Sequence, residues 1–163
     1  MICCGANPAP SVGMSTLAID ELTELVIRCA IAVHKALGPG LLESVYRDCL
    51  VIELRAHGLT VEVERRIAVI YRGQQVRDGL RIDILVDGRL VLEIKAVDRL
   101  HPIHQAQVIT YLKLGGFEAG LIFNFNSTSL RSGPKRVDHP DVYEQRRAAR
   151  LGRNASTSQG KTS

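Results

Sequence analysis

Tryptophan is absent from this 163-residue sequence, and aromatic residues of all kinds make up only 4% of it. Proteins that hold single-stranded nucleic acid by base stacking need several aromatic rings on one surface. The composition therefore argues against a stacking platform, and any nucleic-acid partner is expected to be bound through its backbone and shape.

Long apolar runs and secretion signals are also missing. No stretch of about 18 uninterrupted apolar residues occurs, and the first fifteen residues lack the basic start and apolar core of a secretory signal. We therefore expect a soluble, cytoplasmic protein without a membrane partner. A GxSxG motif and a local Cys/His pair are absent too, which argues against a small-molecule hydrolase.

The four cysteines show no metal-binding or disulfide pattern. Cys3 and Cys4 are adjacent, whereas Cys29 and Cys49 fall within helical patterns, and no CxxC or Cys/His spacing occurs. Neither a zinc site nor a disulfide framework is expected.

Positive charge is concentrated at one end of the chain. The formal net charge is +4, but five cations and no acid follow Glu144, so the rest of the chain is near −1. The basic pI therefore gives only weak support for a nucleic-acid partner. We expect a flexible N-terminus at 1–15, one domain at 16–143, and a basic, disordered tail at 144–163.

Hydrophobic periodicity predicts an α/β domain with the element order α-α-β-β-β-α-β. The expected helices cover 20–37, from after Gly40 to Gly58, and 102–114; the expected strands cover 60–71, 77–86, 89–97 and 118–125. Apolar spacing in the second helix predicts a buried face that includes Leu42, Val45, Cys49 and Leu50.

The stretch DILVDGRLVLEIKAV, from Asp83 to Val97, contains two expected strands with apolar residues at every even position. Opposing residues of an antiparallel pair share a face, so the even positions meet one core only if opposing numbers add to an even total. A three-residue loop of Val86, Asp87 and Gly88 satisfies this condition. It predicts Asp83 opposite Val91, with Glu93 diagonal to Asp83 and Lys95 next along the same face.

Two interpretations of these charges remain open. They could form a solvated outer face with weak cross-strand ion pairs among Arg81, Asp83, Glu93 and Lys95. Alternatively, Asp83 and Glu93 could bind Mg²⁺, which takes few protein ligands and lowers the pKa of a bound water. Lys95 would then orient or deprotonate that water, or stabilise charge on a phosphate, giving phosphodiester hydrolysis.

The same residues resemble the PD-(D/E)XK nuclease superfamily, with Asp83 as the first carboxylate and Glu93-Ile94-Lys95 as the (D/E)XK element. Ile82 stands where the superfamily motif has proline. The segment HKALGPGLLESVYRDCL resembles the signature of the GxxExxY family, a branch of that superfamily, through Gly40, Glu43 and Tyr46. The later segment HPIHQAQVITYLKLGGFEAGLIFNFN also resembles that family, including the spacing of Gln107 and Tyr111.

The resemblance implies a restriction-endonuclease-like core, a mixed sheet flanked by helices, with the site where the second and third core strands diverge. It also implies a nucleic-acid substrate and a divalent cation, Mg²⁺ or Mn²⁺, held by Asp83 and Glu93. Glu43 is then a third acidic group, and Gln107 is a candidate to orient water or phosphate.

Each of the remaining candidate site residues also has a purely structural interpretation. Tyr46, His104 and Tyr111 are candidate substrate-binding residues, but for Tyr46 packing in the core or at its rim is favoured over catalysis. His104, Gln107 and Tyr111 could instead form the polar outer stripe of the helix expected at 102–114. Glu43 could simply favour a helix N-terminus. As a whole, the chain could be a non-catalytic nucleic-acid-binding or protein-interaction module that retains the nuclease fold.

Overall fold

The computed structural model describes residues 16–76, 79–130 and 134–144. The expected flexible N-terminus at 1–15 lies outside the described residues, as does all of the expected basic tail except Glu144. None of the described helices is both long enough and apolar enough to cross a bilayer.

The expected order of elements is confirmed, with small additions. The main helices of the described residues are α1 (Ile19–Leu37), α2 (Glu43–Ala56) and α3 (Pro102–Gly115). The main strands are β1 (Val61–Ile67), β4 (Leu80–Val86), β5 (Leu90–Lys95), β6 (Ala119–Asn124) and β7 (Lys135–Asp138). A small hairpin begins with β2 (Ile70–Tyr71), at the end of the first expected strand, and returns through β3 (Gln74–Gln75), which was not predicted.

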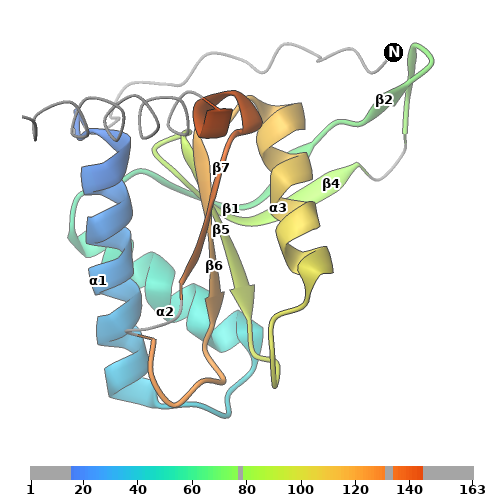
Figure 1. Cartoon of the computed structure of the whole chain (residues 1–163). Helices are drawn as coiled ribbons and strands as arrows, with labels where there is room; N and C mark the ends of the chain where they lie inside the picture. The colour runs from blue at the N-terminus through green and yellow to red at the C-terminus, as the bar shows by residue number, and fades with distance from the viewer. Residues whose placement is uncertain (1–15, 77–78, 131–133, 145–163) are drawn as a thin grey trace, which may run out of the picture.

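The five main strands form one mixed sheet in the order β1-β4-β5-β6-β7. Only β5 and β6 are parallel, as expected for strands joined through a helix, and the other neighbours are antiparallel. Helices α1 and α2 cover one face of the sheet, and α3 covers the other (Figure 1). This arrangement confirms the α/β fold and is consistent with a restriction-endonuclease-like core.

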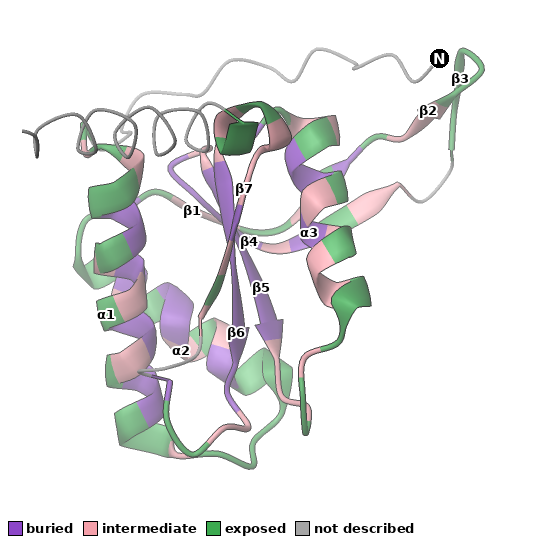
Figure 2. Ribbon diagram, viewed as in Figure 1, coloured by how far each residue is buried: buried purple, intermediate pink, exposed green. Residues whose placement is uncertain are grey.

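Apolar residues fill both faces of the sheet, so β5 and β6 are buried almost throughout (Figure 2). The core beneath α1 and α2 includes Leu22, Val26, Leu50, Leu54, Ile84, Leu92, Leu121 and Phe123. The core beneath α3 includes Leu85, Val91, Val108, Tyr111, Leu112 and Ile122. Close approach of α3 depends on Gly120 of β6, because a Cβ atom there would collide with Val108.

The predicted buried face of α2 was partly wrong. Leu42 precedes the first helical residue and is 74% exposed, and Val45 is 38% exposed. The buried positions are Tyr46, Leu50, Val51 and Leu54. Because the helix begins at Glu43, its inward stripe follows 46, 50 and 54, and two apolar side chains remain at the surface beside its first turn.

The hairpin register has the predicted parity but is shifted by two residues. Val86 pairs with Leu90 and Ile84 with Leu92, so opposing numbers add to an even total, yet the loop is 87–89 and not 86–88. Asp87 and Gly88 both have positive φ, at 50° and 64°, and the Asp87 carboxylate accepts a hydrogen bond from Thr60 N. That bond holds Asp87 inside the loop. Val91 therefore pairs with Leu85 and not with Asp83, which lies just beyond the last paired residue of β4, Ile84.

The even-numbered residues do not all meet one core, contrary to expectation. Ile84 and Val86 pack beneath α1 and α2, whereas Leu80 and Ile82 contact the core beneath α3. The change occurs at Asp83, where β4 leaves β5 and follows the twist of β1 instead.

Candidate active site

The predicted site lies where β4 and β5 separate. Their backbone pairing ends at Ile84 and Leu92, after which β4 stays with β1 and β5 stays with β6 as far as Lys95 (Figure 1). The Asp83 carboxylate occupies the opening gap and accepts a hydrogen bond of 2.8 Å from Ile94 N. A side chain therefore satisfies a backbone group that would otherwise continue the ladder.

Glu93 and Lys95 project from the same face of β5, two residues apart. Lys95 Nζ donates to Glu93 Oε1 at 2.6 Å. The Glu93 side chain is only 3% exposed, and its second oxygen, Oε2, is buried and has no hydrogen-bond partner among the described residues. A buried carboxylate oxygen without a partner is costly, so this position is suited to a cation.

Burial and mutual repulsion perturb the titration of all three groups. Burial, followed by the charge of Asp83, raises the pKa of Glu93 to about 7, despite the opposing effect of Lys95. Burial also raises the pKa of Asp83, against the Ile94 N–H bond. For Lys95, burial favours the neutral amine, but the bond to Glu93 and the surrounding carboxylates outweigh it and raise the pKa. The cluster therefore holds more negative charge than Lys95 neutralises.

Glu43, the first residue of α2, reaches the end of β5. Its Oε1 accepts a hydrogen bond of 2.9 Å from Ala96 N, and its charge contributes to the raised pKa of both Asp83 and Glu93. A shallow hollow beside it is lined by Leu41, Leu42, Glu43, Ser44 and Ala96. Glu43 thus lies with the central cluster and is accessible from solvent.

Helix α3 places its three candidates at different depths. Gln107 is half-buried and donates from Nε2 to the Tyr111 hydroxyl at 2.5 Å. Tyr111 is 2% exposed, and burial together with the charge of Glu93 raises its pKa to about 12. Tyr111 is therefore placed to hold Gln107 in position and is poorly placed to touch substrate.

His104 lies nearer to solvent, beside a second hollow formed with His101, Val97, Asp98 and Arg99. Its Nδ1 accepts a hydrogen bond from His101 N at 3.2 Å, which leaves the ring proton on Nε2. Slight burial and the neighbouring charge of Lys95 lower the pKa of His104. A polar outer stripe does not describe these residues, since Gln107 and Tyr111 face inward.

Tyr46 is fully buried and its hydroxyl is engaged twice. It donates to Gly38 O at 2.6 Å and accepts from Leu41 N at 3.1 Å, and its ring stacks on Phe125 at 4.5 Å between centroids. Both bonds fix the Gly-Pro-Gly corner before α2. The structure thus gives Tyr46 a packing role, and direct contact with substrate would require the corner to open.

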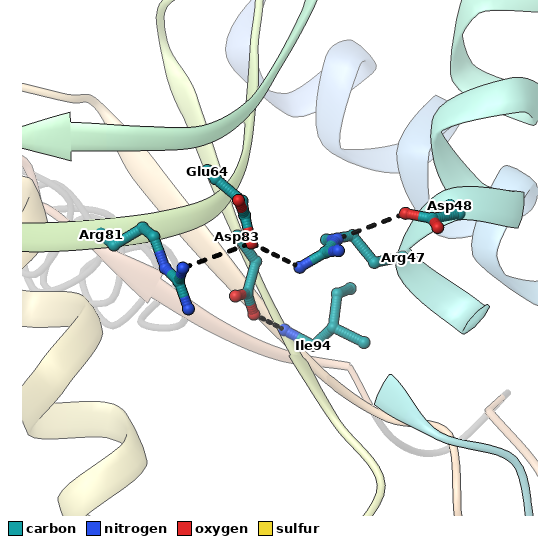
Figure 3. Close-up of polar contacts among 6 residues, drawn as sticks. All are labelled: Arg47, Asp48, Glu64, Arg81, Asp83 and Ile94. Atoms are coloured by element: carbon teal, nitrogen blue, oxygen red, sulfur yellow. Dashed lines mark hydrogen bonds and ion pairs between the residues drawn. The ribbon is translucent and has the colours of Figure 1, made fainter. Parts of the chain in front are cut away.

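An ion-pair network lies beside Asp83 and was not predicted from the sequence. Arg47 of α2 and Arg81 of β4 both pair with Glu64 Oε1, at 3.1 and 3.4 Å, and Arg47 also contacts Asp48 (Figure 3). Glu64 has a φ of 53° and is skipped in the register of β1 with β4. Arg47 opposes the rise in the Asp83 pKa. Its spacing of four residues from Glu43 is the sequence signal that could have identified it.

The interpretation as a solvated charged face is wrong. Arg81 pairs with Glu64 and not with Asp83, and the sheet face that carries Glu93 is covered by α3. A third hollow, lined partly by Gln105, Arg136 and Tyr143, lies between α3 and β7 and contains no predicted site residue.

The donor set fits a hard divalent cation. Asp83, Glu93 and Glu43 offer only carboxylate oxygens, which Mg²⁺ and Mn²⁺ prefer. Their oxygens do not form a closed triad, because the only three-residue group of ligand atoms within 4.8 Å in the described chain lies elsewhere. An open arrangement of this kind leaves room for water and a phosphate oxygen.

The comparisons with known proteins agree with this geometry. A family model described as the PD-(D/E)XK nuclease superfamily matches residues 20–137. No curated protein and no solved structure matches the chain. Because the match covers most of the sequence, the chain belongs to the PD-(D/E)XK nuclease superfamily, whose members generally use divalent metals and act on nucleic acid.

Proposed function

We propose that this protein is a metal-dependent nuclease of the GxxExxY branch, which hydrolyses phosphodiester bonds in DNA or RNA. The observation that carries the proposal is the Glu93 carboxylate, which is buried, paired with Lys95 through one oxygen only, and repelled by the charge of Asp83, with Oε2 lacking a partner among the described residues. A protein that kept this face only for stability would gain from replacing so costly a group.

Asp83 and Glu93 are the proposed ligands of Mg²⁺ or Mn²⁺, with Glu43 as a third acidic group at the solvent side. When bound, the cation would lower the pKa of a water ligand and neutralise charge on the scissile phosphate. Occupation of the free Glu93 oxygen also explains why the chain tolerates the repulsion between Glu93 and Asp83.

Lys95 is proposed to stabilise negative charge on the phosphate. Its pKa is raised, so at neutral pH the amine is an ammonium group, held in place by Glu93 at 2.6 Å. That protonation state favours electrostatic stabilisation over proton abstraction. Gln107, fixed by Tyr111, retains an amide oxygen that can accept a hydrogen bond from the attacking water and so orient it. His104 is proposed as a phosphate contact at the rim.

Two variants test the proposal. Asp83→Ala should abolish Mn²⁺ binding and cleavage together, whereas Lys95→Ala should bind Mn²⁺ normally and cleave about a hundred- to a thousandfold more slowly. Lys35→Ala, at an exposed position of α1, is the matched control and should match the wild type. Binding is measured by Mn²⁺ electron paramagnetic resonance, and cleavage with single- and double-stranded DNA and RNA.

A non-catalytic module is the competing outcome. In that case no substrate is cleaved with either metal, and Asp83→Ala and Lys95→Ala leave nucleic-acid or protein binding unchanged. If the wild type cleaves and Asp83→Ala cleaves equally well, Asp83 is not a ligand of the catalytic cation.

A further inference from the structure

A second cluster of metal-ligating side chains lies at the opposite end of α2 from Glu43. Cys29 comes from α1, and Glu53 and His57 lie one helical turn apart at the end of α2. One ligand atom from each of the three falls within 4.8 Å of the others. Ten residues separate Glu43 from Glu53, so this cluster is about 15 Å along the helix from the nuclease site.

The distances within the cluster match a small tetrahedral ion. Cys29 Sγ lies 3.6 Å from His57 Nδ1. Bond lengths of about 2.3 Å to sulfur and 2.0 Å to nitrogen at a tetrahedral angle give an S–N separation of about 3.5 Å. Glu53 Oε1 lies 3.9 Å from the same nitrogen, so the carboxylate must move inward by roughly half an ångström. Its side chain is 37% exposed and has the freedom to do so.

In the structure, the His57 ring contacts both other members of the cluster. His57 Nδ1 donates to Glu53 O at 2.9 Å, and the same carbonyl also accepts the His57 backbone N–H at 3.3 Å. If the ring proton moves to Nε2, the carbonyl keeps its backbone partner and Nδ1 gains a free lone pair. Binding of a cation by Cys29 requires loss of the thiol proton, which a divalent ion next to the sulfur favours.

We propose that Cys29, Glu53 and His57 bind a zinc ion, with water as the fourth ligand. Binding releases the thiol proton to solvent and moves the ring proton of His57 to Nε2. A thiolate and an imidazole select zinc over Mg²⁺ or Mn²⁺, which prefer oxygen ligands. The ion ties the middle of α1 to the end of α2, and so acts on stability and not on the chemistry at Glu93.

Cobalt substitution tests this site without any activity assay. In a Cys3→Ser, Cys4→Ser background, which leaves only the cysteines of the described residues, Co²⁺ should produce a near-ultraviolet thiolate charge-transfer band that one equivalent of Zn²⁺ removes. Co²⁺ at the carboxylates of the nuclease site gives no such band. The band should vanish in Cys29→Ser and His57→Ala and persist in Cys49→Ser, the matched control, whose cysteine lies in α2 and is half-buried.

A stability measurement separates binding from misfolding. Free Zn²⁺ at a hundred times the Kd should raise the Tm by about 5 to 10 °C in the background protein. The same zinc should leave the Tm of His57→Ala unchanged, and circular dichroism of that variant checks its fold, since His57 is exposed at the surface. A background protein that shows no thiolate band, or a band that persists in Cys29→Ser, would overturn the proposal.

Discussion

The Glu93 carboxylate should cost the protein stability when no cation is bound, and replacing it with an amide should recover that cost. Glu93→Gln keeps the shape of the side chain and removes the charge that is buried beside Asp83. We expect the variant to lose metal binding and cleavage and yet to unfold at higher denaturant concentration than the wild type, in the presence of a chelator at pH 8.

The magnitude follows from the pKa of Glu93, which is about 7 in the folded protein against an ordinary value of 4.5. Between these values the folded protein keeps a proton that the unfolded chain releases, so stability falls as the pH rises from 4.5 to 7. Above pH 7 the full cost is present, about 3 kcal/mol. For a chain of this length that corresponds to a Tm difference of roughly 6 to 12 °C.

Urea unfolding of wild type and Glu93→Gln at pH 5 and pH 8 measures the effect. The advantage of the variant should be small at pH 5 and should grow by about 2 to 3 kcal/mol by pH 8. Glu24→Gln, at an exposed position of α1, is the control and should show no growth. An advantage that is equal at both pH values would refute the assignment of a raised pKa to Glu93.

Two further predictions follow from the site and its surroundings. Because a proton competes with the cation for Glu93, Mn²⁺ affinity should fall by about tenfold per pH unit below pH 7, and a titration that is flat from pH 5.5 to 7 would exclude Glu93 as a ligand. Tyr46→Phe removes hydrogen bonds to Gly38 O and Leu41 N and should lower the free energy of unfolding by about 1 to 3 kcal/mol, measured by urea, while cleavage per folded molecule is retained. If the Tyr46→Phe protein is well folded but does not cleave, Tyr46 takes part in substrate binding and the packing role is insufficient.

Periodicity predicted the helices and the main strands because their apolar stripes are long and their ends carry Gly or Pro. It missed β7, whose sequence Lys-Arg-Val-Asp is mostly charged. That strand is at the edge of the sheet, where Arg136 pairs with Asp20 and Asp138. An edge strand has one free side and needs little apolar content, so a hydrophobic pattern does not reveal it.

The alternation of apolar residues in β4 and β5 predicted Asp83, Glu93 and Lys95 on one face of the sheet. It could not distinguish strand registers that differ by two residues, because these keep the same residues on the same face. The choice depends on Asp87, whose carboxylate binds Thr60 from a distant part of the chain. The Cys29 and His57 pair was invisible for a similar reason, since 28 residues separate them and only the packing of α1 on α2 brings them together. Spacing along the chain reports local geometry, whereas these contacts depend on the tertiary fold.

The divergence of β4 from β5 explains why the same three residues are both costly and useful. Backbone pairing stops at Ile84 and Leu92, so the Asp83 side chain replaces a strand partner by bonding to Ile94 N, and its charge repels that of Glu93. Closer pairing would exclude water and cation from the gap, and wider separation would solvate the carboxylates and relieve their repulsion. At the observed separation Lys95 neutralises only one oxygen of Glu93. A divalent cation would neutralise the remaining charge, and its binding free energy would offset the cost of the buried carboxylate.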